Sequence, residues 1–403
     1  MIRIKDTKYP STAALLGDAI KIAEYYGFVP LEDLPRSVAE AGVPAAKKPP
    51  AAAEIESLLN FARRDERGLP AVARKALLSA RRSGEATFAW RISQTNSSVP
   101  TLALELHVFG HPSAMAEALL IVVGNAIAEN AGIQSRVLSV NNIGSSESSS
   151  RYVRDVGQYL RKHIESISPT LRPRLTDDPL GTLVQLIERG HPAVARAPQA
   201  MEYLTEDERR RFWEFLEYLE VFGLPYELNG QVLGSRDVWS HSLYEIASTD
   251  TETQTRIPFA FGGRYDPVMS RFARRPDSAV MIGINVEIRG ATKPKKNARA
   301  TPGIFFAHLG AEARRRALRV METLRGAEIP VHQSLTYERL GEQMSTASKL
   351  AVPYILIMGH KEAVENAILV REVATNSQEQ VPLEDLSNYL RRRRMGQSRE
   401  VHA

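Results

Sequence analysis

Apolar residues recur along most of this chain at the spacing of helices or strands, and the two kinds of segment alternate. The clearest segments in the first third are a helix over Ala13 to Gly27, a strand over Phe28 to Leu31, a strand over Thr101 to Phe109 and a helix over Ser113 to Ala131. From Arg151 to Gly223 the pattern is almost wholly helical, and its last helix opens with a capping box of Thr205 and Glu208. A mixed α/β (α+β) chain is therefore expected.

The last hundred residues repeat this alternation on a smaller scale. The predicted elements are a strand over Ile304 to Ala307, a helix over Glu312 to Arg325, a helix over Ser334 to Lys349, a strand over Pro353 to Gly359, a strand over Ala367 to Val373 and a closing helix that starts at Val381. Alternating helices and strands predict a small mixed or parallel sheet with helical cover.

Length and composition set the outer bounds. At 403 residues, with 43% hydrophobic and 25% charged residues, the chain has room for two or three globular domains. No apolar run reaches the length of a membrane span and no secretory signal opens the sequence, so we expect a cytoplasmic protein without a membrane partner. The absence of cysteine excludes disulfides and thiolate chemistry, and a net charge of +5 suits a polyanionic partner.

Pro-rich, Lys-rich and Ser-rich stretches mark the expected joints. Residues 292 to 302 have the composition of an exposed linker, and residues 41 to 53 that of a surface loop. The serine run from Gly144 to Ser150 predicts a flexible loop before a helix. Four arginines, Arg391 to Arg394, are expected to close the final helix, either as a solvated cap or as an RNA-backbone contact.

The segment Phe261 to Asp266 carries the most specific signal, with the order Gly-Gly-Arg-Tyr-Asp. Two glycines permit positive φ and close approach of a ligand, and the next three residues supply a cation, an aromatic wall and an acceptor, which predicts a pocket-lining turn. The segment, with the strand-like Ala279 to Glu287, resembles the late active-site block of histidyl-tRNA synthetases, where G-G-R-Y-D lines the amino-acid pocket.

The resemblance spans nearly the whole chain and is weakest over residues 36 to 100. Further segments that carry it are Asn141 to Gly144, Tyr152 to His163, Leu171 to Leu175, Asp178 to Leu180, Ala197 to Leu204 and Leu219 to Leu228. It implies a class II synthetase-like antiparallel core in residues 1–145 and 224–291, a helical insertion in 146–223, the linker 292–302, and an anticodon-binding-like α/β domain in 303–403. It also implies a homodimer.

The strand signatures of that family are altered here. In place of its F-R-x-E loop the matching region offers only Arg91. The Q-F-G-x-E strand that reads the substrate aligns with Ala103 to His107, so the glutamine becomes Ala103 and the reading glutamate becomes His107. Ordinary histidine activation relies on such groups, because its catalysis is chiefly positioning and charge stabilisation.

The two remaining signatures are also displaced. In the segment aligned with R-G-L-D-Y-Y only Asp237 stays in place, and Arg236 sits two positions late. In the segment aligned with G-L-E-R-L, Glu287 is kept, and Arg289 is one position off, which turns a side chain to another direction. Loss of one transition-state arginine costs several kcal/mol, each about 1.4 kcal/mol being a factor of about ten in rate.

The candidate residues follow from the resemblance. The arginines Arg91, Arg236 and Arg289 are the candidates for any surviving catalysis, and the expected ligand pocket consists of Gly262, Gly263, Arg264, Tyr265, Asp237 and Glu287. The candidates for contact with tRNA or another RNA are Lys349, Lys361 and Arg371. No spacing of histidines and carboxylates indicates a metal site.

Three functions are consistent with this pattern. The leading hypothesis is a catalytically degenerate synthetase paralogue, a pseudoenzyme that binds RNA or acts as a scaffold. The second is a divergent but working histidine–tRNA ligase, which would need ATP and Mg²⁺. The third is a regulatory subunit of ATP phosphoribosyltransferase, a paralogue that generally lacks the anticodon-binding domain.

Overall fold

The computed structural model describes residues 1–34, 68–79, 86–95, 100–249, 255–294, 302–337 and 339–400. The predicted loop over 41 to 53 and most of the predicted linker lie outside these residues. The chain forms two compact units, each assembled from separate stretches. Unit 1 comprises Met1–Leu16, Val29–Glu217 and Pro225–Pro294, and unit 2 comprises Gly17–Phe28, Tyr218–Leu224 and Lys295–Ala403.

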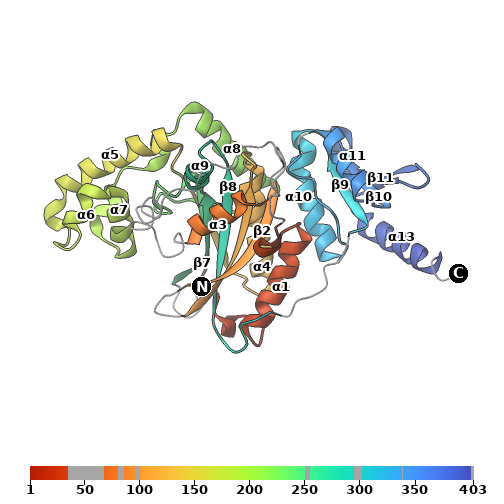
Figure 1. The fold of residues 1–403 in the computed structure, drawn as a ribbon, viewed down its shortest axis with the longest axis horizontal. Coiled ribbons are helices and arrows are strands. Elements are labelled where there is room, and N and C mark those ends of the chain that lie inside the picture. The colour runs from red at the N-terminus through yellow and green to blue at the C-terminus, as the bar shows by residue number, and fades with distance from the viewer. Residues whose placement is uncertain are drawn as a thin grey trace. The chain divides into compact units, whose positions relative to one another are not determined.

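Unit 1 is built on an eight-stranded sheet with the order β1-β2-β3-β8-β7-β6-β4-β5. Figure 1 labels three of these strands, β2, β7 and β8. Its strands are β1 (Val29–Pro30), β2 (Thr87–Thr95), β3 (Thr101–Phe109), β4 (Arg136–Asn142), β5 (Tyr226–Leu228), β6 (Ser240–Thr249), β7 (Arg256–Arg264) and β8 (Ala279–Glu287). Neighbours pair antiparallel except β1 with β2 and β4 with β5. The predicted antiparallel core is confirmed.

Both faces of the central strands are covered, which explains why all nine residues of β3 are buried. One face packs against α4 (Met115–Asn130), and Gly124 of that helix brings its backbone against the side chains of Ile282 and Ile246. The opposite face belongs to a large apolar cluster that also includes residues of α3 (Leu69–Leu77) and α9 (Asp266–Ala273). The candidate site has to be sought on this second face.

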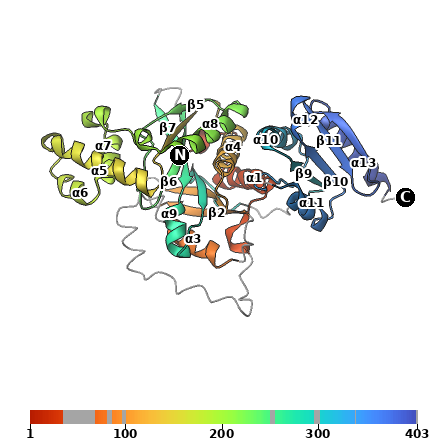
Figure 2. The same ribbon diagram turned by 90° about the horizontal axis from the view of Figure 1, so that it is seen from above.

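The middle of the chain is a helical group beside the sheet (Figure 2). It contains α5 (Ser146–Lys162), α6 (Arg172–Asp177), α7 (Pro179–Glu188) and short 3-10 turns. The helix that follows, α8 (Glu206–Val221), contacts α4 through Arg211 and Glu117. The serine run was wrongly predicted to be a loop, because Ser146 to Ser150 already form the first turns of α5. The capping box of α8 is confirmed, with Thr205 N donating to Glu208 at 2.8 Å and Glu208 N donating to Thr205 Oγ1 at 3.3 Å.

Unit 2 contains a four-stranded sheet, β12-β11-β10-β9, and the second half of α1 (Thr12–Tyr25). The strands are β9 (Ile304–His308), β10 (Tyr354–Met358), β11 (Ala367–Glu372) and β12 (Gln378–Pro382), and the helices are α10 (Ala311–Gly326), α11 (Leu340–Lys349), α12 (His360–Val364) and α13 (Leu386–Glu400). β9 and β10 are parallel and the other pairs antiparallel, so the predicted mixed sheet is confirmed.

Three predicted boundaries in this unit are wrong. The second helix begins at Leu340, because Ser334 is a buried residue whose hydroxyl donates to backbone and side-chain oxygens. Val381 lies in β12, where it pairs with Ile368, and α13 starts only at Leu386. That helix continues to Glu400, beyond the four arginines. None of the helices in the described parts of the chain meets the length and apolarity that a membrane span requires.

Candidate functional site

The predicted glycine turn is a strand. Gly262 and Gly263 lie inside β7 with no positive φ, so the predicted role of left-handed backbone is wrong. A Cβ atom on Gly262 would overlap the carbonyl oxygen of Met281, and one on Gly263 would stand 2.7 Å from the carbonyl oxygen of Ser242. Both glycines therefore allow close packing of β7 between its neighbouring strands.

Arg264 points to the face of the sheet that α4 covers. It pairs with Val280, whereas the preceding Gly263 pairs with Met281 on the other face. The guanidinium is fully buried, and its Nη2 lies 2.7 Å from Oε2 of Glu117 on α4. Arg211 of α8 donates to the other oxygen of Glu117 at 2.6 Å. The contacts of Arg264 are thus internal, and Glu117 links β7 and α8 to α4.

Tyr265, the next residue, contacts a buried polar chain on the opposite face. Its hydroxyl lies 3.0 Å from Nδ1 of His107, and Nε2 of His107 lies 3.2 Å from Oε2 of Glu105. Glu105 in turn accepts two bonds from Arg91, at 2.6 Å from Nε and 3.1 Å from Nη2, and a third from the hydroxyl of Ser93. The structure therefore brings together Tyr265 and Arg91, two predicted site residues.

The charges in this chain of side chains are fixed by their partners. Burial favours the neutral form of Glu105, but the hydrogen bond from His107 and the nearby Arg91 outweigh it and lower the pKa of Glu105 to about 2. Burial also lowers the pKa of His107, which keeps this imidazole neutral near pH 7. With Nε2–H donating to Glu105, Nδ1 accepts from the hydroxyl of Tyr265.

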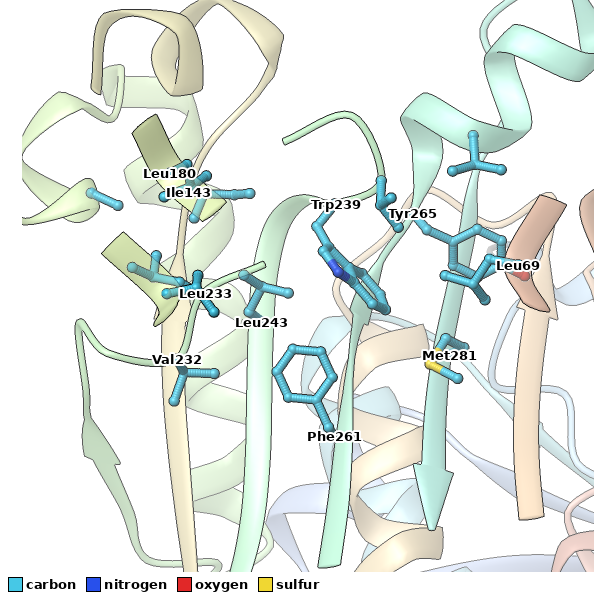
Figure 3. Packing of buried hydrophobic residues seen from close by; sticks show 14 of the residues in the cluster. Leu69, Ile143, Leu180, Val232, Leu233, Trp239, Leu243, Phe261, Tyr265 and Met281 are labelled. Atoms are coloured by element: carbon cyan, nitrogen blue, oxygen red, sulfur yellow. The ribbon is translucent and has the colours of Figure 1, made fainter. Parts of the chain in front are cut away.

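Next to this polar chain the same face is filled by apolar side chains. Trp239 packs edge-on against Phe261, with ring centroids 5.5 Å apart, and against Tyr265 at 6.4 Å. Figure 3 shows Trp239, Phe261 and Met281 together on this face of the sheet, with Leu243 beside them. All four belong to the apolar cluster. This part of the face has the packing of a hydrophobic core.

The other predicted residues of unit 1 are placed apart from the polar chain. Arg236 is exposed and donates to Oγ of Ser150 at 3.2 Å, and Asp237 beside it is also exposed. Glu287 accepts from the backbone N–H of Ile4 at 3.0 Å, and the backbone of Arg289 binds Oγ1 of Thr12 while its side chain is exposed. These four residues make contacts with backbone or hydroxyl groups and none with Arg91.

The predicted RNA contacts lie in unit 2. Lys349 ends α11 and Lys361 lies in α12, both exposed, and Arg371 is half-buried in β11, where it donates to Asn376. Of the arginines at the end of the chain, Arg393 lies over the ring of Tyr389. These positions leave their role in RNA binding a prediction.

Two buried carboxylates were missed in the sequence, Glu105 of the site and Glu117 on the opposite face of the sheet. Glu105 occupies the glycine position of the Q-F-G-x-E pattern, and this replacement was a visible signal that a new side chain enters the face. Glu117 had no such signal, because its partner Arg264 is 147 residues away and neither residue belongs to a motif that pairs them.

The altered face does not fit a nucleotide phosphate. The guanidinium of Arg91 already carries a bidentate carboxylate partner, which is the geometry in which it would take a phosphate. The ionised carboxylate of Glu105 also repels a second anion at the same place. The contacts present at this position therefore disagree with an ATP site.

Comparison with known proteins agrees with the architecture. The anticodon binding domain family matches residues 304–393. A histidine–tRNA ligase from Symbiobacterium thermophilum is 27% identical over 296 residues, which cover 72% of this chain and 68% of that protein.

Two solved structures are also similar. Apo histidyl-tRNA synthetase from S. aureus gives a TM-score of 0.49 with 15% identity, over 93% of this chain and 94% of that one. An ATP phosphoribosyltransferase regulatory subunit/histidyl-tRNA synthetase from Bacillus halodurans gives 0.42 with 14% identity, over 86% and 92%.

The antiparallel sheet, the helical insertion and the second α/β domain define a class II aminoacyl-tRNA synthetase fold. Within that class, the chain is similar to histidine–tRNA ligases, which match it over about 70% of its length.

Proposed function

We propose that this chain is a histidyl-tRNA-synthetase-like protein that does not activate histidine and acts as an RNA-binding or scaffold paralogue. The observation that carries the proposal is the bidentate pair of Arg91 and Glu105, in which the one arginine of the F-R-x-E region is taken by an internal carboxylate. The apolar packing of Trp239 against Phe261 beside it supports the same conclusion.

The RNA-binding part of the proposal rests on the second domain. The anticodon binding domain match covers the part of unit 2 that runs from β9 into α13, which supports retention of the domain that contacts RNA. Lys349, Lys361 and Arg371 are the residues we assign to phosphate contacts. A homodimer, a cytoplasmic location and the domain limits 1–145 with 224–291, 146–223 and 303–403 belong to the same proposal.

The first test is histidine-dependent ATP–pyrophosphate exchange by the purified protein, with an authentic histidyl-tRNA synthetase as the positive control. Silence with histidine and with a pool of the other amino acids is expected, because the guanidinium of Arg91 is not free. Exchange with any amino acid would establish the competing function, a working ligase that uses ATP and Mg²⁺, and would overturn the proposal.

The second test is binding of labelled tRNA at several salt concentrations. Affinity should fall steeply as salt rises, because contacts with phosphates release counterions. The triple variant Lys349→Ala, Lys361→Ala, Arg371→Ala should bind more weakly and with a shallower salt slope, and Arg161→Ala on the exposed side of α5 serves as a control cation outside unit 2. Absence of RNA binding with stable capture of ATP phosphoribosyltransferase would favour the regulatory-subunit function instead.

A further inference from the structure

We propose that Glu105 is a resident anion that closes a latent oxyanion-binding site formed by Arg91, Ser93 and His107. This inference rests on the proposed function in one respect: in the wild-type protein Glu105 occupies the donors, so that no external anion binds there. The ligand that the opened site would take is a carboxylate or phosphate group, the chemistry shared by an amino acid and a nucleotide.

The donors converge because of strand register. Arg91 and Glu105 are directly opposite each other on β2 and β3, and Ser93 pairs with Ala103 on the same face. His107 lies two residues beyond Glu105, so its side chain is on that face as well. Four donor atoms thus point at one carboxylate: Nε and Nη2 of Arg91, Oγ of Ser93 and Nε2 of His107.

The arrangement is that of an anion site with its ligand supplied by the chain. A fork of two guanidinium N–H groups matches the two oxygens of a carboxylate or phosphate, and here the chain itself supplies the carboxylate. The side chain of Glu105 is 7% exposed and that of Arg91 18% exposed, so the pair is largely removed from water while its rim stays accessible. Gly283, half-buried and opposite Glu105 on β8, leaves room beside the carboxylate.

Removal of Glu105 leaves these donors without their acceptor. The half-buried guanidinium of Arg91 then carries an uncompensated positive charge, and burial makes the loss of its partner costly. An external oxyanion restores the lost bonds, so binding is coupled to stability. Gly68 leaves space for the guanidinium of Arg91, because a Cβ atom on Gly68 would overlap Nη2 of that arginine.

The test compares Glu105→Ala with the wild-type protein by thermal melting and calorimetry with inorganic phosphate and with acetate, against sodium chloride at equal ionic strength. We expect phosphate to bind Glu105→Ala at least ten-fold more tightly than wild type and to raise its melting temperature. Adding Arg91→Met should abolish that gain. Equal response of wild type and Glu105→Ala, or no response of a folded Glu105→Ala protein, would overturn the inference.

Two further variants keep the test decisive. Glu105→Gln preserves shape while removing the charge, so it covers the case in which Glu105→Ala does not fold, and it should bind phosphate at least three-fold more tightly than wild type. A folded Glu105→Gln protein that matches wild type would count against the inference. Glu227→Ala is the matched control, because Glu227 also accepts from an arginine, Arg256, and a serine, Ser139, but its side chain is 46% exposed. It should show no anion-specific gain.

The source of the oxyanion is resolved by paired ligands on Glu105→Ala. Histidine with histidinol as the analogue without a carboxylate tests an amino acid, and ATP with adenosine tests a nucleotide. Either acid binding better than its analogue without the anionic group supports the inference and identifies the source. A silent exchange assay together with an unresponsive Glu105→Ala protein would remove this inference and leave the proposed function intact, whereas exchange by wild type would remove the proposed function.

Discussion

Glu117 is a single fully buried carboxylate that receives two arginines from different elements. Arg264 of β7 approaches it at 2.7 Å and Arg211 of α8 at 2.6 Å. Burial alone would raise the pKa of Glu117, but the two guanidinium groups lower it to about 2. Its charge therefore persists throughout the physiological range and holds α4, β7 and α8 together.

Glu117→Gln should destabilise unit 1 strongly. Breaking the buried pair leaves Arg264 with Asp266, at 3.4 Å from Nη1, as its remaining carboxylate, and the loss of a buried partner costs roughly 3–5 kcal/mol of the free energy of unfolding. Urea denaturation followed by tryptophan fluorescence measures it, and Asp18→Asn, which removes an exposed partner of Lys21, is the control with an expected change below about 0.5 kcal/mol. A Glu117→Gln protein as stable as wild type would show that the pair contributes nothing.

The pH dependence of the same variant has a definite sign. Because the folded pKa of Glu117 lies below its ordinary value of 4.5, its contribution is present above about pH 4.5 and is lost as pH falls toward 2. Glu117→Gln should therefore lose less stability than wild type between these values. Denaturation midpoints at pH 6 and pH 3 test this, and equal losses in both proteins would contradict it.

At the scale of single residues, the sequence predicted which residues belong to the site better than it predicted which residues they contact. It singled out Tyr265 and Arg91, which the structure connects through His107 and Glu105. The sequence also predicted that Arg264 lines the same pocket as Tyr265, because the two residues are adjacent in the motif. The alternation of a strand sends adjacent side chains to opposite faces, and only the full length of β7 shows that the strand extends this far.

Local signals decided which elements could be predicted. The capping box at Thr205 and Glu208 and the alternation of apolar and polar residues in β3 depend on neighbouring residues, and both elements were found. β12 was missed because Gln378 to Gln380 are exposed and polar, so its strand state depends on pairing with β11. Whether such a polar segment forms a strand depends on the strand with which it pairs.

Gly262→Ala should destabilise the sheet at β7, where this strand lies close to its neighbour β8. The new methyl group would overlap the carbonyl oxygen of Met281 and lie 2.9 Å from Cα of Ile282, and neither backbone atom can rotate away. Overpacking of this kind costs about 1–3 kcal/mol of the free energy of unfolding. Urea denaturation measures the loss.

Gly283→Ala on the adjacent strand β8 is the matched control. Its methyl group would find its nearest neighbours at 3.5 Å or more, an ordinary contact distance. We expect a change within about 0.5 kcal/mol. Similar losses in the two variants would mean that glycine is needed in both strands for a reason other than the space beside Gly262.

The whole molecule is assembled from segments that are not contiguous in the chain. Unit 2 recruits Gly17–Phe28 from the N-terminal region, although the anticodon binding domain match begins only at residue 304. The hydroxyl of Tyr25 donates to the carbonyl oxygen of Met321 at 3.1 Å, and that of Tyr26 donates to Glu322. A division of the sequence by motifs cannot show this, because the contacts join residues almost 300 positions apart.

A fragment of residues 302–403 should consequently be less stable than the same segment in the full chain. It lacks the second half of α1, so it loses both tyrosine hydrogen bonds and the donation of Gln333 Nε2 to the carbonyl oxygen of Tyr26 at 3.2 Å. Circular dichroism at increasing temperature measures the stability of the fragment. A peptide of residues 12–28 should raise its melting temperature, and the same peptide with Tyr25→Ala and Tyr26→Ala should have little effect. If the fragment alone melted at the temperature of unit 2 in the full chain, the N-terminal helix would be dispensable to that unit, and the two tyrosines would contribute no net stability.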